Sequence, residues 1–114
     1  MIEVAPDELR DMLSGGVGAL QLLDVRRAEA VARDQCALPG AVWRDPEQVE
    51  AWWRELEPAR PVLVYCVHGH EVGRGVRDRL RAHGLDARLL AGGLTGWRES
   101  GGRVVPLTSR GDAS

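Results

Sequence analysis

The hydrophobic positions of the chain follow two different periods, which alternate along its length. Mainly apolar stretches, typical of the buried strands of a parallel sheet, occur at residues 20–25, 41–43, 62–66 and 87–90. Apolar residues spaced as in amphipathic helices occur at residues 6–14, 45–56 and 72–83. Shorter elements are expected as helices at 27–33 and after Gly92-Gly93, and as an edge strand at 2–4. The alternation predicts an α/β domain of three layers, with a central, mainly parallel five-stranded sheet flanked by helices.

The ends of these elements carry residues that start and stop helices. Pro6 suits the first position of the first helix, and Gly15-Gly16 suit its end. Asp45 is expected to cap the helix that follows it. The sequence then becomes polar near its end, so we expect one domain over residues 1–105 and a disordered polar tail over residues 106–114.

Composition narrows the class of protein. The 114 residues suit a single domain, and a formal net charge of -2 gives no reason to expect nucleic acid or anionic lipid as a partner. No apolar stretch approaches the ~20 residues that a membrane span needs, and no secretion-signal pattern is present. Two cysteines without such a signal indicate free thiols in a reducing compartment, so we expect a cytoplasmic protein.

Cys66 stands where chemistry is expected. It closes the apolar run Val62-Leu63-Val64-Tyr65, and the loop Val67-His68-Gly69-His70-Glu71 separates it from a helix that begins at Val72. Sites of open α/β sheets form at the carboxyl ends of the strands. Backbone N–H groups and the positive end of a helix dipole at this position favour a thiolate over a thiol.

Four segments together resemble the single-domain rhodaneses of the thiosulfate sulfurtransferase family. They are Leu23-Asp24-Val25-Arg26, Leu38-Pro39-Gly40-Ala41, the Cys66 loop, and Leu90-Ala91-Gly92-Gly93-Leu94-Thr95-Gly96-Trp97. Each segment is weak evidence alone, but four in this order and at this spacing are specific. The resemblance covers nearly the whole chain, from Val4 to Val105.

The resemblance implies an enzyme in which Cys66 is the nucleophile. Cys66 would take the outer sulfur of a small-molecule donor, thiosulfate or a persulfide, and hold it as a persulfide. It would then pass the sulfur to cyanide, to a thiol or to a sulfur-accepting protein. Residues 67–72 would form the substrate-binding loop, Asp24 and Arg26 would support that loop, and no metal or organic cofactor would be needed. The plain structural alternative is that Asp24 and Arg26 pair with each other or cap the end of their strand.

Glu71 departs from the family pattern. Many members carry a cationic or hydroxyl-bearing residue at the sixth loop position, counting Cys66 as the first, where this chain has Glu71. A carboxylate ~6 Å from a thiolate would repel it by about 3 kcal/mol at an effective dielectric constant of ~20, and solvent screening would reduce this repulsion. Thiosulfate is a dianion, so Glu71 makes it a doubtful physiological donor.

Two other functions are compatible with a cysteine at this position. Tyrosine phosphatases and arsenate reductases share the cysteine-loop-helix geometry, but they clamp phosphate with an arginine six residues after the cysteine. That position holds Val72 here, and the nearest arginine, Arg74, lies on the helix. The alternative that remains is a non-catalytic or sulfur-relay module, although inactive members commonly lose the cysteine that this chain keeps.

Several residues also have plain structural interpretations. Cys66 can be an inert core thiol, and Cys36 a small buried residue or a resolving thiol for Cys66. His68 and His70 suit a solvated loop, since neighbouring residues on one tight turn converge poorly on a metal ion. The last residues with a plain structural interpretation lie on one face of the helix that follows, which is expected to be solvated; they are Arg74, Arg77 and Arg81.

Overall fold

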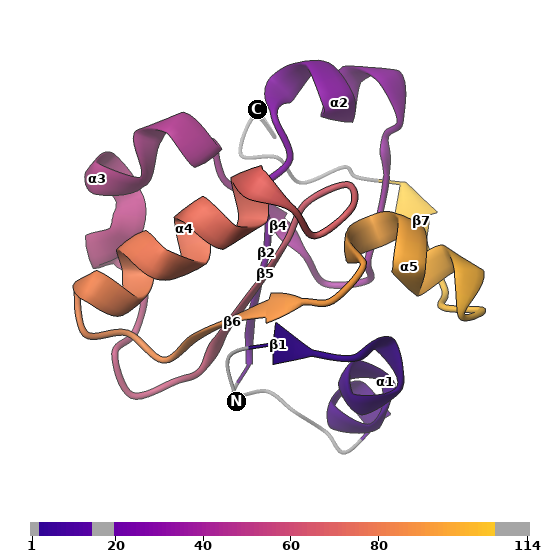
Figure 1. Cartoon of the computed structure of the whole chain (residues 1–114), viewed down its shortest axis with the longest axis horizontal. Helices are drawn as coiled ribbons and strands as arrows, with labels where there is room; N and C mark the ends of the chain where they lie inside the picture. The colour runs from indigo at the N-terminus through magenta and orange to yellow at the C-terminus, as the bar shows by residue number, and fades with distance from the viewer. Residues whose placement is uncertain (1–2, 15–19, 107–114) are drawn as a thin grey trace.

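The computed structural model describes residues 3–14 and 20–106 (Figure 1). A five-stranded sheet in the order β1-β6-β5-β2-β4 forms its centre, and all four of its pairings are parallel. The strands are β1 (Glu3–Val4), β2 (Gln21–Asp24), β4 (Val42–Trp43), β5 (Val62–Tyr65) and β6 (Ala87–Leu90). The predicted α/β fold is confirmed, including the edge position of β1. Among the described residues, no helix has the length and apolar character to cross a membrane.

Strand β5 is the centre of the sheet and of the core. All four of its side chains are buried, and they alternate between the two faces, as the pleat of a strand requires. Val62 and Val64 belong to one apolar cluster, and Leu63 and Tyr65 belong to the other. The strand is therefore apolar throughout because both faces of the sheet are covered.

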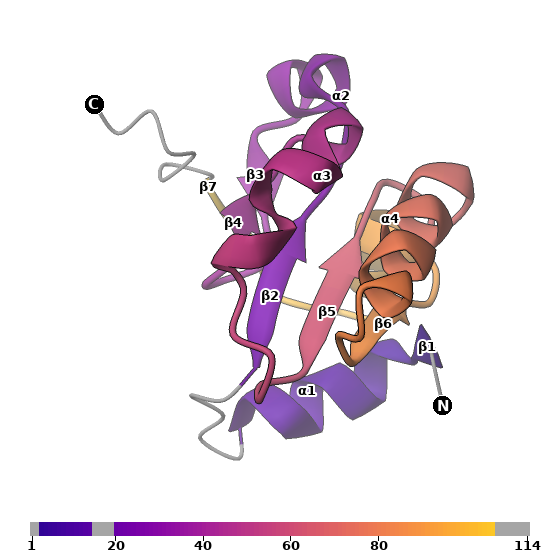
Figure 2. The same cartoon turned by 90° about the vertical axis from the view of Figure 1, so that its left-hand side faces the viewer.

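Each face of the sheet is covered by a pair of helices (Figures 1 and 2). Helices α3 (Val49–Trp52) and α4 (Glu71–Ala82) cover the face of Val62 and Val64. Helices α1 (Pro6–Ser14) and α5 (Gly93–Glu99) cover the opposite face. Helix α2 (Ala28–Arg33) lies beyond the carboxyl ends of the central strands, the end at which the predicted site lies.

The structure corrects one prediction about the helices and leaves another untested. The expected continuous helix over 45–56 is divided into the 3₁₀ turn Pro46–Gln48, the helix α3 and a second 3₁₀ turn, Trp53–Glu55. The Asp45 side chain nevertheless caps the first turn, because it accepts a hydrogen bond from the Glu47 N–H. The predicted helix end at Gly15-Gly16 lies outside the described residues.

Arg77 does not share the solvated helix face expected for it. It is 7% exposed, whereas Arg74 and Arg81 are exposed. Its guanidinium lies 3.5 Å from the Glu3 carboxylate and donates to Asp78 over 2.9 Å. Helix α4 therefore contacts the edge strand β1 through a charged side chain, which a count of apolar positions does not detect.

The sequence pattern does not predict a second, two-stranded sheet, which the structure contains. Strand β3 (Cys36–Ala37) pairs antiparallel with β7 (Val105–Pro106), and Cys36 is the register partner of Pro106. The expected tail over 106–114 therefore begins at least one residue later, and residues 107–114 lie outside the described part. Two-residue strands are too short to show a hydrophobic period.

We predict that Gly102, which leads into β7, cannot carry a side chain. A Cβ at Gly102 would overlap the indole ring of Trp97, whose Nε1–H is already bound to the Arg103 carbonyl at 2.7 Å. Gly102→Ala should lower the free energy of unfolding by about 1–3 kcal/mol, measured by urea denaturation. Gly96→Ala is the matched control, because a Cβ there stays 3.4 Å from its nearest neighbour, the Ala91 carbonyl. Equal midpoints for the two variants would contradict this account.

Candidate active site

Cys66 follows the last residue of β5, and its thiol faces helix α4. The residue is 6% exposed and continues the row of Val62 and Val64 on that face of the sheet. A Cβ at Gly73 of α4 would lie 3.0 Å from the Cys66 Sγ and 2.6 Å from the Leu89 Cδ1. The missing side chain at Gly73 therefore provides the space that the thiol occupies.

Backbone hydrogen bonds tie the loop after Cys66 to the start of α5. The Leu94 N–H donates to the Cys66 carbonyl over 2.9 Å, and the Thr95 N–H donates to the Val67 carbonyl over 3.0 Å. All peptide bonds of the described residues are trans, so the N–H groups of Val67 and His68 point away from α5. Among the described residues, neither of these N–H groups donates a hydrogen bond. Together with the first N–H groups of α4, they can stabilise an anionic sulfur.

Two glycines allow the loop after Cys66 to approach the start of α5 closely enough for these hydrogen bonds. Gly69 has a φ of 74°, and a Cβ there would lie 2.9 Å from the Gly92 nitrogen. Gly93 has a φ of 62°, and a Cβ there would lie 2.5 Å from the Cys66 carbonyl oxygen and 2.6 Å from that of Val67. The Gly92-Gly93 pair of the sequence motif therefore lies directly against the cysteine loop, although the two segments are far apart in the sequence.

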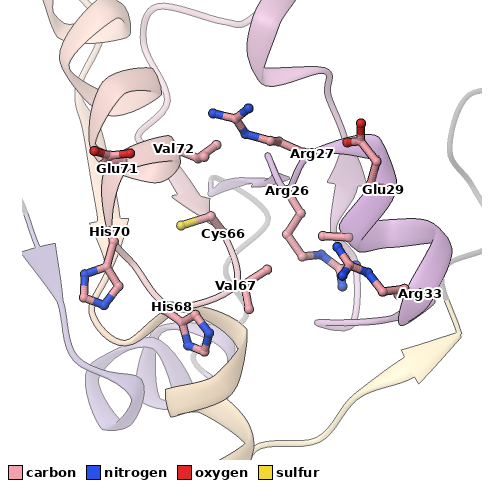
Figure 3. Close-up of a pocket in the computed structure, with 11 residues that line it drawn as sticks. Arg26, Arg27, Glu29, Arg33, Cys66, Val67, His68, His70, Glu71 and Val72 are labelled. Carbon is pink, nitrogen blue, oxygen red and sulfur yellow. The ribbon is translucent and has the colours of Figure 1, made fainter.

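A cavity of about 650 Å³ opens at Cys66, between its loop and helix α2 (Figure 3). The predicted site residues that line it are Arg26, Cys66, Val67, His68, His70, Glu71 and Val72. Further lining residues, from α2 and the residue before it, are Arg27, Glu29, Ala30 and Arg33. Gly69 is buried against α5 and does not line the cavity, and Asp24 does not line it either.

The remaining candidate ligands do not gather into a metal site. His68 and His70 are exposed, with ring centroids 6.1 Å apart. Within residues 3–14 and 20–106, no group of three or more His, Cys, Asp or Glu is placed to hold a metal ion. Cys36 is half-buried in β3 and is not part of the cavity lining.

Asp24 and Arg26 form a buried ion pair beside the cavity. The Arg26 guanidinium donates to Asp24 Oδ2 over 2.7 Å, and the two side chains are 1% and 0% exposed. Arg26 also donates to the carbonyl oxygens of Asp34 and Cys36, over 2.8 and 3.1 Å. Burial opposes the charged guanidinium, but the hydrogen bonds and charge of Asp24 outweigh it and raise the pKa of Arg26 above its ordinary value.

Tyr65 connects this ion pair to the strand that carries Cys66. Its hydroxyl donates to Asp24 Oδ2 over 3.0 Å and accepts from the Leu38 N–H over 3.2 Å. Burial, followed by the charge of Asp24, raises the pKa of Tyr65, so the hydroxyl remains a donor. Of the interpretations of Asp24 and Arg26, the structure shows the mutual pair, and the Asp24 carboxylate also accepts from the Arg26 backbone N–H at the end of the strand over 3.0 Å. No hydrogen bond from either side chain to residues 67–72 occurs in the described part of the chain.

Sequence reasoning missed the basic wall of the cavity. Arg27 and Arg33 lie far from Cys66 in the sequence and carry no motif of their own. The order of the strands could have located them. Arg27 and Arg33 follow β2, Cys66 follows β5, and these two strands are parallel neighbours. The carboxyl ends of such strands meet at one edge of the sheet.

The fold and the site together define a class of protein. It is a parallel α/β domain whose cysteine lies at the turn between the central strand and a helix and faces a cavity. The sequence model of the rhodanese-like domain family matches residues 5–100. The chain belongs to the rhodanese-like domain family, as the four sequence segments indicated.

Solved structures place the fold in the same group. A full-length protein from Lactobacillus plantarum is 26% identical, with a TM-score of 0.84, over 93% of this chain and 88% of that one. A thiosulfate sulfurtransferase from Pseudomonas aeruginosa is 24% identical, with a TM-score of 0.79, over 95% of this chain and 20% of that one. A protein of unknown function from Rhodopseudomonas palustris, described as a possible tyrosine phosphatase, is 18% identical, with a TM-score of 0.79, over 92% and 85% of the two chains. The last two similarities show the fold alone.

We predict opposite effects of alanine at two glycines of α4. Gly73→Ala would press on the Cys66 Sγ and Leu89, so it should cost about 1–3 kcal/mol of stability and slow alkylation of Cys66 by iodoacetamide. Gly75 has nothing within 4 Å of its Cβ position, so Gly75→Ala should raise stability by roughly 0.5–1 kcal/mol. Thermal melting and alkylation rates measure both effects. A Gly73→Ala protein that reacts and melts like the parent would refute the placement of the thiol.

We also predict that the buried pair matters more for stability than exposed pairs do. Asp24→Asn should cost about 3–5 kcal/mol, because it leaves the buried Arg26 without its counter-charge. Tyr65→Phe should cost about 1–3 kcal/mol, since the Leu38 N–H loses its acceptor. Asp7→Asn, at an exposed ion pair with Arg10, is the control and should change stability by less than about 1 kcal/mol. Urea denaturation gives all three values, and a ranking with Asp7→Asn as the most damaging would contradict this interpretation.

Proposed function

We propose that this rhodanese-like domain is an active sulfurtransferase whose sulfur carrier is Cys66. The observation that carries the proposal is the position of the Cys66 thiol. It lies at the end of β5, faces the first turns of the 12-residue helix α4, and opens onto a cavity large enough for a donor. Family membership supports the proposal, and retention of the cysteine favours catalysis over a purely non-catalytic module.

The reaction would run in two displacements at one sulfur atom. The Cys66 thiolate attacks the outer sulfur of the donor, the bond between that sulfur and the rest of the donor breaks, and the donor leaves with the electron pair. Thiosulfate would leave as sulfite, and a persulfide would leave as a thiolate. An acceptor such as cyanide then attacks the outer sulfur of the Cys66 persulfide, and the Cys66 thiolate is restored.

The loop favours the anionic forms of this cycle. The N–H groups of Val67 and His68 point away from α5 and are joined by the first N–H groups of α4, which have no acceptor within the helix. Such preorganised donors stabilise negative charge where it develops, without reorganising during the reaction. The persulfide anion would occupy the cavity side of the loop.

Phosphatase chemistry is not favoured by the residues present. The sixth position after Cys66 is Val72, which lines the cavity with an apolar side chain. Arg74 is exposed on α4 and is not among the cavity-lining residues. A phosphoryl group would therefore lack a guanidinium supplied by the end of the cysteine loop, the position from which phosphatases of this geometry clamp it.

We predict that Cys66 gains one sulfur atom from a donor and loses it to cyanide. Intact-mass measurement after incubation with thiosulfate, or with a low-molecular-weight persulfide, should show the added sulfur on Cys66. Cys66→Ser should abolish both the adduct and thiocyanate formation. Cys36→Ser, the matched control outside the cavity, should retain them. No adduct from any donor, with a folded parent protein, would leave a non-catalytic module as the function.

A further inference from the structure

The cavity is much larger than the simplest sulfur donor. Thiosulfate has about the bulk of three or four water molecules at roughly 30 Å³ each, against a cavity of about 650 Å³. Cavities of this size, roughly 300–1,000 Å³, usually hold organic ligands. The space around Cys66 therefore suits a donor with a carbon skeleton.

The walls of the cavity differ in charge. The α4 wall carries Glu71 at the rim, which has no ion-pair partner among the described residues. The facing α2 wall carries Arg27, Glu29 and Arg33. Arg27 lies 3.8 Å from the exposed Glu47, and Arg33 has no ion-pair partner in the described part of the chain. Figure 3 shows Cys66 between the two walls.

These charges suit a donor that carries both signs. A carboxylate at the rim opposes an approaching dianion and attracts an ammonium group, whereas the α2 wall, with two arginines and one glutamate, attracts a carboxylate. The neighbouring Arg26 adds little to this field, because Asp24 neutralises it within hydrogen-bond distance. His68 and His70 lie on the loop that leads into α4, with His70 on the same side of Cys66 as Glu71 (Figure 3).

Glu71 also has a role within its own helix. As an acidic residue in the first turn of α4, it interacts favourably with the helix dipole. An aspartate or glutamate anywhere in that turn would serve this purpose, so the dipole does not account for a carboxylate at the cavity rim. The test below separates the two roles, because a change in the helix affects all donors equally.

We propose that the donor is a zwitterionic thiol persulfide, the persulfide of an amino acid or of a short peptide. This inference rests on the proposed sulfurtransferase function. Glu71 would bind the ammonium group, and Arg33, with Arg27, would bind the carboxylate. The Cys66 thiolate attacks the outer sulfur of R–S–SH, a new S–S bond forms, and the old one breaks. The products are the Cys66 persulfide and the thiolate R–S⁻, with no oxidant or reductant consumed.

The test measures the rate constant for sulfur loading of Cys66 by donors that carry different charged groups. The probes are named by the charged groups that they carry besides the persulfide. They are the persulfides of cysteine (one ammonium, one carboxylate), glutathione (one ammonium, two carboxylates), cysteamine (ammonium only), mercaptopropionate (carboxylate only) and mercaptoethanol (neither), with thiosulfate as the dianion; the first two are the zwitterions and mercaptoethanol persulfide is the uncharged probe. Both zwitterions should load the parent protein about three- to five-fold faster than the uncharged probe, as for partly exposed ion pairs. The faster of the two distinguishes an amino acid from a short peptide.

Two variants then assign the charges. Glu71→Gln should slow cysteamine persulfide about three- to five-fold, leave mercaptopropionate persulfide unslowed, and accelerate thiosulfate. Arg33→Gln should slow mercaptopropionate persulfide and thiosulfate and leave cysteamine persulfide unchanged. Glu71→Asp should keep the preference for ammonium, and Glu99→Gln, on α5 outside the cavity, is the control for a lost surface charge.

The outcomes separate this inference from the proposed function. If mercaptoethanol persulfide loads Cys66 as fast as the zwitterions, or if Glu71→Gln changes all donors by one factor, the zwitterion assignment is wrong while sulfur transfer stands. If no probe loads the folded parent protein, sulfur transfer itself is wrong. A change of sign between cysteamine persulfide and thiosulfate in Glu71→Gln is the result that the inference requires.

Discussion

The site depends on backbone contact between two turns that are far apart in the sequence. The loop that follows Cys66 lies against the start of α5, and no side chain fits at Gly69 or Gly93, where positive φ angles and close carbonyl oxygens exclude a Cβ. The hydrogen bonds from Leu94 and Thr95 fix the loop carbonyls toward α5, which turns the opposite N–H groups away from it. A third glycine, in α4, provides the space that the thiol fills. Together these contacts set the position and the environment of one sulfur atom.

The sheet supplies the rigid frame behind this contact. The thiol belongs to the face that packs on α4, whereas the adjacent Tyr65 belongs to the other face and binds the buried Asp24–Arg26 pair. A buried ion pair is weak evidence for stability as such, but removing one partner is costly. Its hydrogen bonds to the carbonyls of residues 34 and 36 hold the segment beyond α2 next to the sheet. The basic wall of the cavity is thereby placed opposite the loop.

Sequence patterns predicted the helices, strands and loop whose formation depends on residues close together in the chain. The apolar runs located four of the five strands of the main sheet, and the strand-loop-helix pattern located Cys66 and most of its cavity-lining loop. Arg77 was misplaced because its burial depends on the edge strand β1, and the β3–β7 pairing was missed because two residues carry no period. Arg27 and Arg33 needed the strand order, since only the β2–β5 pairing brings their helix to the cysteine. Gly93 was visible as a motif, but its purpose appears only in the tertiary contact with the loop.

The central claim, that Cys66 carries the sulfur in transit, is tested most directly by the kinetic competence of its persulfide. The protein is loaded with one sulfur on Cys66, freed of donor, and mixed rapidly with cyanide, and the loss of the added sulfur is followed by quenched intact-mass measurement. The account predicts that this single transfer yields one thiocyanate per loaded protein, at a rate no slower than steady-state turnover under the same conditions. A Cys66 persulfide that decays more slowly than turnover would show that the sulfur travels by another route.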